Sequence, residues 1–362
     1  MPLVPLPDAS ERCGGKARNL GLLLRAGFRV PAGFAIPDPL GDPGWEREIE
    51  AGLRRLGPGP VAVRSSALAE DGLESSFAGQ LATTLGVTTA AEVIEAVHRS
   101  ASSGSSPEAV AYANRTHRDA PATAGVIVQV MVQPETAGVM FTRHPVTGAE
   151  QVVIEAARGL GDAVAAGTVT PESYLVDGVH VQTARHRGGQ LLSTARACAL
   201  AALGRDIENL FGQPQDIEWA IAGDETWVLQ ARPITTAPTT APPVRATPGE
   251  VLLTGIAASP GTAVGPARII GSLDDFARFR PDDVLVCRTT SPAWTPLLAR
   301  ACAVVTETGG MLAHAAIVAR EFGIPAVLAA PGAMTALAEG RLVRVDGTRG
   351  HVGTATGIGG RN

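Results

Sequence analysis

A stretch rich in proline, threonine and alanine at residues 235–248 is the feature that most limits how this 362-residue chain can fold. It shows no apolar period, which predicts a linker rather than a helix or a strand. Fully extended, it would reach about 40 Å, at roughly 3 Å per residue. The chain is long enough for two domains that each bury a core. We therefore expect one domain at 1–234, the linker at 235–249 and a second domain at 250–356.

Composition excludes several classes of function. The net charge is −5, so the chain as a whole has no basic footprint for nucleic acid. Its four cysteines form no CxxC pair, which favours reduced thiols over a zinc site or a disulfide framework. The N-terminus lacks the pattern of a signal peptide, and no apolar run reaches about 18 residues. These features predict a cytoplasmic protein with neither nucleic acid nor membrane as a partner.

The region after the linker alternates apolar runs with helix-forming segments, which predicts an α/β domain. At its centre a turn containing Gly309 and Gly310 leads into a helix that has His314 at or near its start and ends before Gly323. Backbone N–H groups at a helix start attract phosphate, and the helix dipole disfavours imidazolium, so a neutral His314 could accept a phosphoryl group. A histidine satisfied by the turn is the alternative. The expected strands are 263–270, 284–287, 303–306, 326–328 and 342–345.

Two cationic side chains in the first domain lie where a phosphate could reach them. Lys16 follows a glycine pair at the start of a leucine-rich helix, and Arg64 leaves an apolar strand together with two serines. A guanidinium pairs bidentately with phosphate oxygens, and an ammonium at a helix start can be aimed at a phosphate. A solvated lysine and an ordinary strand exit are the alternatives. The two motifs together favour a phosphate clamp.

Segment 214–232 contains two alternating apolar and polar runs on either side of a Gly-Asp turn, which predicts a pair of antiparallel strands. Asp216 and Glu218 would share one face of the first strand. Gln230 and Arg232 would share one face of its partner. Oxygen ligands beside an arginine suit Mg²⁺ with phosphates, whereas an exposed polar strand face is the alternative.

These motifs together resemble the family of phosphoenolpyruvate synthase, pyruvate phosphate dikinase and rifampin phosphotransferase. The resemblance covers nearly the whole chain and identifies an ATP-grasp domain of the PEP/pyruvate-binding type, followed by a swivelling phosphohistidine domain. Family members usually carry a hydroxyl residue one or two places before the histidine, where this chain has Leu312 and Ala313. The chain also ends without the large PEP/pyruvate barrel of full-length relatives. The matching motifs are Gly-Gly-Lys16, Val-Arg64-Ser-Ser, Phe-Ala-Gly79-Gln, Val-Gln129-Val-Met-Val, Gly-Leu-Gly161, Asp-Ile-Glu218-Trp, Leu-Gln230-Ala-Arg232 and Gly-Gly-Met-Leu-Ala-His314-Ala-Ala-Ile-Val-Ala-Arg.

The resemblance implies an α/β fold, with an α+β ATP-grasp domain joined to a β/β/α phosphohistidine domain, and a dikinase-type phosphotransferase. ATP would pass its β-phosphate to His314 and release AMP, the γ-phosphate would go to water or phosphate, and the histidine would then phosphorylate an unidentified small molecule. A phosphocarrier or regulatory protein that serves a separate acceptor-binding chain is the alternative. The implied roles are phosphate binding and catalysis for Lys16, Arg64 and Arg232 with His314, nucleotide binding for Gly79, Thr83, Gln129, Met131 and Val132, and Mg²⁺ binding for Glu218 and Gln230.

Overall fold

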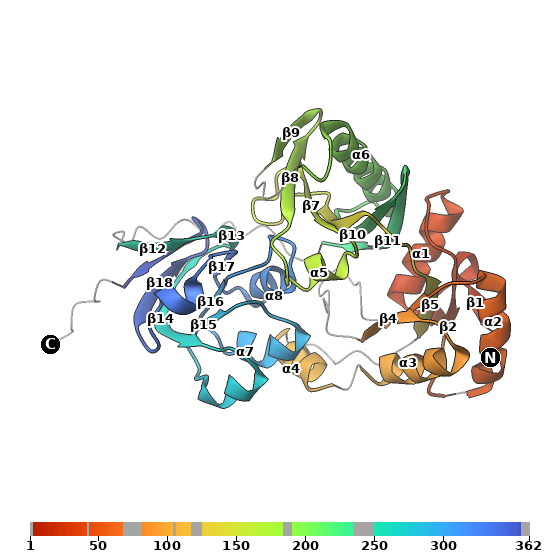
Figure 1. The fold of residues 1–362 in the computed structure, drawn as a ribbon, viewed down its shortest axis with the longest axis horizontal. Coiled ribbons are helices and arrows are strands. Elements are labelled where there is room, and N and C mark those ends of the chain that lie inside the picture. The colour runs from red at the N-terminus through yellow and green to blue at the C-terminus, as the bar shows by residue number, and fades with distance from the viewer. Residues whose placement is uncertain are drawn as a thin grey trace.

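Figure 1 shows the chain as a computed structural model that describes residues 3–41, 43–67, 82–103, 106–116, 125–183, 190–234 and 250–355. The strands of these residues form three sheets, of five, six and eight strands. This mixed architecture confirms the expected α/β fold class. The expected linker 235–249 and the candidate residue Gly79 lie outside the described residues.

The first sheet is antiparallel throughout, in the order β1-β2-β5-β3-β4. Helix α3 packs on β3, β4 and β5, and apolar side chains of α2 and α3 join the core on this side of the sheet. Strand residues alternate between the two faces, so Val63 enters this core while Arg64 points to the opposite face. The elements are β1 (Val4–Pro5), β2 (Gly33–Ile36), β3 (Val61–Ser65), β4 (Thr83–Val87), β5 (Val126–Val130), α1 (Gly15–Arg25), α2 (Ile49–Leu56) and α3 (Ala90–Ser102), with the short 3-10 helices Leu6–Asp8, Glu11–Cys13 and Pro43–Glu48.

The second sheet is also antiparallel, in the order β11-β10-β6-β7-β8-β9. Its core includes Trp219 of β10. Leu20 and Leu23 of α1, the helix that precedes the first sheet's strand β2, belong to the same apolar cluster, so this cluster joins the two sheets. The predicted hairpin is confirmed, because Asp216 pairs with Arg232 across its two strands. The elements are β6 (Thr136–Phe141), β7 (Val152–Arg158), β8 (Glu172–Asp177), β9 (His180–Thr183), β10 (Gln215–Ala222), β11 (Glu225–Pro233), α5 (Asp162–Ala165) and α6 (Thr194–Phe211).

The third sheet is mixed. Strands β14, β15, β16 and β17 run parallel, as expected where helices alternate with strands, and the remaining pairs are antiparallel. All five strands expected after the linker are present. Three short ones, β12, β13 and β19, were not predicted. The elements are β12 (Val251–Thr254), β13 (Ile256–Ser259), β14 (Thr262–Ile269), β15 (Val284–Cys287), β16 (Ala303–Thr306), β17 (Ala326–Leu328), β18 (Leu342–Asp346), β19 (His351–Thr354), α7 (Thr295–Leu298), α8 (His314–Phe322) and α9 (Ala333–Ala336), with 3-10 helices at Leu273–Arg278 and Pro292–Trp294.

One helix from before the linker packs into the core of the residues after it. Helix α4 (Pro107–Thr116) lies beside α7 and α8, as Figure 1 shows in orange against blue. Tyr112 of α4 is fully buried, its ring 5.8 Å from that of Phe322, and its hydroxyl donates to a carboxylate oxygen of Glu321 at 2.6 Å. The first and third sheets are therefore joined by a packed helix as well as by the covalent chain.

Candidate active site

A cavity of about 460 Å³ lies where the three sheets meet. Its walls come from β3, β4 and β5 of the first sheet, from β6, β10 and β11 of the second, and from α8 and its preceding turn in the third. Every candidate residue that the structure describes lines this one cavity: Lys16, Arg64, Thr83, Gln129, Met131, Val132, Glu218, Gln230, Arg232 and His314.

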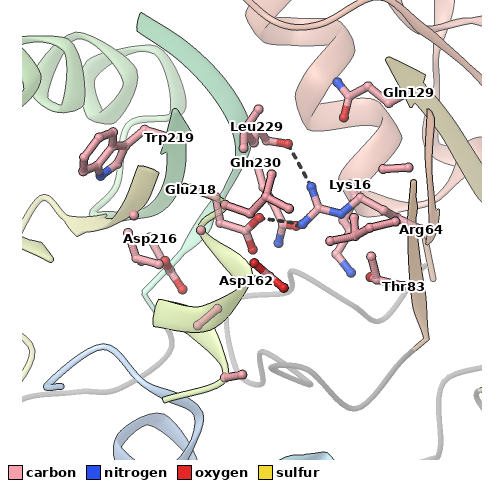
Figure 2. A pocket seen from close by; sticks show the side chains of 18 of the residues that line it. Lys16, Arg64, Thr83, Gln129, Asp162, Asp216, Glu218, Trp219, Leu229 and Gln230 are labelled. Carbon is pink, nitrogen blue, oxygen red and sulfur yellow. Dashed lines mark hydrogen bonds and ion pairs between the residues drawn. The ribbon is translucent and has the colours of Figure 1, made fainter. Parts of the chain in front are cut away.

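Arg64 is the centre of a polar cluster in this cavity (Figure 2). Its Nη2 donates to Glu218 Oε2 at 2.6 Å and to Gln230 Oε1 at 2.7 Å, while Nη1 donates to the carbonyl of Leu229 at 3.1 Å. Burial alone would raise the pKa of Glu218, but Arg64, Arg232 and Lys16 together outweigh it and the pKa is lowered. Glu218 therefore stays a carboxylate, and its oxygen and that of Gln230 both accept from the same nitrogen, Arg64 Nη2.

Lys16 is placed by a close approach between α1 and the end of β3. Gly14, just before α1, has a positive φ of 86°, and a Cβ there would overlap the carbonyl oxygen of Ser66. The Ser66 hydroxyl in turn accepts from the backbone N–H of Ala17 at 3.1 Å. The glycine pair seen in the sequence thus lets the helix start against the Arg64 strand. Lys16 lies in the cavity wall as a result.

Arg232 and Asp216 form a buried ion pair at the same wall. The Nε and Nη2 of Arg232 both lie 2.8 Å from Asp216 Oδ2, and Asp216 is 5% exposed. Burial raises the pKa of Asp216, and the guanidinium opposes that shift. As expected, Asp216 shares a strand face with Glu218 and lies beside an arginine, so the alternative of an exposed polar face does not hold for it.

His314 is the first residue of α8 and is 3% exposed. Burial lowers the pKa of its imidazole to about 4, so it is neutral at pH 7. This confirms the expected neutral state, although burial rather than the helix dipole is the cause. The hydroxyl of Thr290, which follows β15, lies 3.0 Å from His314 Nδ1. Sequence reasoning missed Thr290; its only signal was the hydroxyl-rich run that follows a predicted strand.

The remaining walls are largely apolar. Gln129 is not free to reach far into the cavity, because its side-chain amide donates to the carbonyl of Pro31 at 3.0 Å. Leu160, Gly161 and Asp162, at the start of α5, line the opposite side. They follow the antiparallel strand β7 rather than forming a βαβ unit. The apolar wall residues include Ala62, Leu85, Val130, Met131, Val132, Leu160 and Leu229.

No group of three or more His, Cys, Asp or Glu that could hold a metal occurs within the described part of the chain. Glu218 with Gln230 still fits Mg²⁺, because both present oxygen atoms to the same point and phosphate oxygens can complete the ligand set. The four cysteines are free thiols, two of them buried. Of the helices described, none is both long and apolar enough to cross a bilayer.

Comparison with known proteins gives matches over most of the chain. The family described as pyruvate phosphate dikinase, AMP/ATP-binding domain, matches residues 45–191 and 178–248, and PEP-utilising enzyme, mobile domain, matches 279–350. Probable phosphoenolpyruvate synthases of Archaeoglobus fulgidus and Methanothermobacter thermautotrophicus are each 34% identical, over 97% and 94% of this chain. The chain spans about three-fifths of their lengths, 58% and 61%. A solved D-alanine-D-alanine ligase from Coxiella burnetii matches at 13% identity over 61% of this chain and 48% of the ligase, with a TM-score of 0.34, too low to support any argument.

Proposed function

Because this chain belongs to the family of pyruvate phosphate dikinase and phosphoenolpyruvate synthase, we propose that it transfers a phosphoryl group from ATP to His314. The observation that carries the proposal is that His314 lines the same cavity as three cationic side chains, Lys16, Arg64 and Arg232. These residues come from four separate elements, α1, β3, β11 and α8, and gather at one site. A phosphate in this cavity would meet both the charges that bind it and the nucleophile that accepts it.

The walls divide the cavity into two functional ends. The apolar residues after β5 and at the start of α5 would hold the adenine ring, as in most nucleotide pockets. Lys16, Arg64 and Arg232 would hold the phosphates, where their positive charge stabilises the charge that develops during transfer. Glu218 and Gln230 would hold Mg²⁺, which neutralises phosphate charge when bound. Arg64 would then exchange part of its contact with these two oxygens for contact with phosphate.

The histidine chemistry follows from its environment. Since Thr290 engages Nδ1, we assign the attack to Nε2 of the neutral ring. A bond forms between Nε2 and the β-phosphorus, the bond from that phosphorus to the oxygen of AMP breaks, and AMP leaves with the electron pair. The γ-phosphoryl group passes to water or inorganic phosphate. Removal of water from the buried imidazole also protects the phosphoramidate from premature hydrolysis.

The second half of the cycle would deliver the phosphoryl group to a small molecule. The relatives are named phosphoenolpyruvate synthases, so pyruvate is the first acceptor to test. A separate chain that binds the acceptor is the competing arrangement. Transfer from the phosphorylated, purified chain to pyruvate would support the small-molecule form of the proposal.

The first half-reaction can be tested directly. With ATP and Mg²⁺ the purified chain should gain one phosphoryl group on His314 and release AMP, because the β-phosphate is the group transferred. Intact-protein mass spectrometry and chromatography of the nucleotides would measure both. His314→Ala is the control and should stay unmodified. ADP as the nucleotide product, or equal labelling of His314→Ala, would refute the proposed reaction.

A further inference from the structure

A buried glutamate of the ATP-side sheet lies directly against the turn that carries the catalytic histidine. Glu155, on β7, is 0% exposed. Its two carboxylate oxygens accept the backbone N–H of Met311 at 2.6 Å and that of Leu312 at 3.1 Å. The Ser173 hydroxyl contacts the carboxylate at 3.4 Å. Glu155 thus reaches across the boundary between the second and third sheets.

The position of these two N–H groups explains why the contact matters. They precede His314 by three and two residues, in the turn that leads into α8. The N-cap residue of α8 is Ala313, whose methyl group cannot accept a hydrogen bond, so no N-cap side chain fixes the start of this helix. The carboxylate of Glu155 instead holds the turn in front of the helix from another part of the fold.

The loop is shaped around this carboxylate. A Cβ on Gly310 would overlap both oxygens of Glu155. Beside it, the carbonyl of Gly167 accepts from the hydroxyls of Thr289 and Thr308, each at 2.8 Å. Two sets of hydrogen bonds therefore join this side of the cavity to the loops of the third sheet, one from Glu155 of β7 and one from Gly167, which follows α5.

The charges across this contact are complementary. Arg320, on α8, donates through Nη1 to the carbonyls of Met311 and Ala258 at 2.9 and 2.8 Å. Burial lowers the pKa of Arg320 to about 10, which leaves it cationic at neutral pH. Burial raises the pKa of Glu155 to about 7, against the opposing effect of the two N–H groups and Arg320. A carboxylate held this deeply is costly unless these partners are in place.

We propose that Glu155 is a positioning residue, which binds the turn in front of α8 from the ATP-binding side and so holds the His314 imidazole against the phosphate end of the cavity. This role rests on the proposed phosphoryl transfer, which the contact would align. Because Glu155 belongs to a different sheet, its two hydrogen bonds to the turn are made only while the histidine turn is docked. Undocking would leave the N–H groups of Met311 and Leu312 to water.

Docking can be measured without any phosphoryl transfer. Diethyl pyrocarbonate modifies accessible neutral imidazoles, and peptide mass spectrometry can follow the rate at His314, which is 3% exposed. Glu155→Ala should raise this rate by about tenfold, the range expected when buried N–H groups lose their acceptor. Gly310→Ala should raise it in the same direction, since its added methyl overlaps the carboxylate.

Two matched controls separate docking from general destabilisation. Glu172 is another buried glutamate of the same sheet; it accepts the N–H of Leu191 at 2.9 Å but lies away from the histidine turn. Glu172→Ala should leave the His314 rate unchanged. Gly271→Ala is the control for the glycine change, because a Cβ there makes only an ordinary contact with Asp275.

Catalysis supplies the second readout. In single-turnover reactions with ATP, Glu155→Ala should slow phosphorylation of His314 by about tenfold while the Kd for ATP stays unchanged. Glu155→Gln should recover part of the rate, because its amide oxygen still accepts an N–H. A Glu155→Ala protein whose His314 stays as protected as in the wild type would overturn the inference. If no variant is phosphorylated, the proposed function fails while the modification rates still decide the role of Glu155.

Discussion

At the scale of single residues, His314 shows how burial sets chemical state. Its pKa is lowered to about 4, so at pH 7 only about one ring in a thousand is charged. In the proposed reaction, a neutral ring keeps the electron pair that attacks phosphorus, and the Thr290 hydroxyl at Nδ1 selects which nitrogen faces the phosphate.

This ionisation state can be measured by NMR titration of the imidazole C–H signals. The signal absent from His314→Gln should belong to a ring that stays neutral down to about pH 4, whereas an unperturbed ring titrates near 6.5. The lowered pKa also makes stability depend on pH, because as pH falls from about 6.5 to about 4 the unfolded chain takes up a proton at this histidine that the folded chain does not. The free energy of unfolding should therefore drop over this window, and by less in His314→Gln. A midpoint near 6.5 for His314 would contradict the assignment.

At the scale of elements, the β10–β11 hairpin organises the phosphate end of the cavity. Antiparallel register places Asp216 opposite Arg232 and Glu218 opposite Gln230, and a register shift follows Glu218. Each facing pair joins one acidic residue to a group that the nucleotide would also contact. With a single set of backbone hydrogen bonds, the hairpin therefore fixes both the oxygens that we propose bind Mg²⁺ and one guanidinium that we propose binds phosphate.

Arg232→Ala should cost stability as well as nucleotide affinity. It would leave Asp216, 5% exposed, without its ion-pair partner, and breaking a buried pair in this way costs about 3–5 kcal/mol. Urea unfolding would give the value. Adding Asp216→Asn to Arg232→Ala should recover part of the loss, since no buried charge then remains unpaired. Equal stability of the single and double variants would show that the pair matters only for binding.

At the scale of the whole molecule, the structure presents His314 at the ATP cavity, with α4 and Glu155 holding the third sheet there. An acceptor must also meet His314, and the two encounters cannot share one rigid arrangement if the phosphate is buried in each. We therefore propose that residues 250–356 move as a body about the linker, of the hinge type that gates many multi-step enzymes.

The linker tests this movement. Deleting about eight residues from 235–248 should leave ATP binding unchanged but slow at least one step that involves His314, because the shortened tether cannot serve both positions. Calorimetric titration of ATP and single-turnover measurement of each transfer would separate binding from chemistry. An unchanged complete cycle in the deletion variant would show that the acceptor binds beside ATP and that no domain movement is needed.

Much of the local structure could be predicted from the sequence. The strand 303–306, the glycine turn and the helix that has His314 at its start and ends before Gly323 all appear where expected, and 284–287 and 326–328 match their strands residue for residue. Hydrophobic periodicity and the positions of glycine and proline are local signals, because they determine the backbone conformation of their own segment. The short strands β12, β13 and β19 were missed, since each has only four residues, too few to show a hydrophobic alternation.

By itself the sequence determined the helix-start histidine, the polar hairpin and the kind of residue that could bind phosphate, because these depend on spacing within a segment. Only the tertiary structure decided which distant groups meet. Thr290 reaches His314, and Glu155 reaches an N–H group 157 residues away, through the packing of separate sheets. Neither contact leaves a pattern in the local chain, since a buried carboxylate on a strand looks the same in sequence whether it faces solvent, a neighbouring strand or another helix's start.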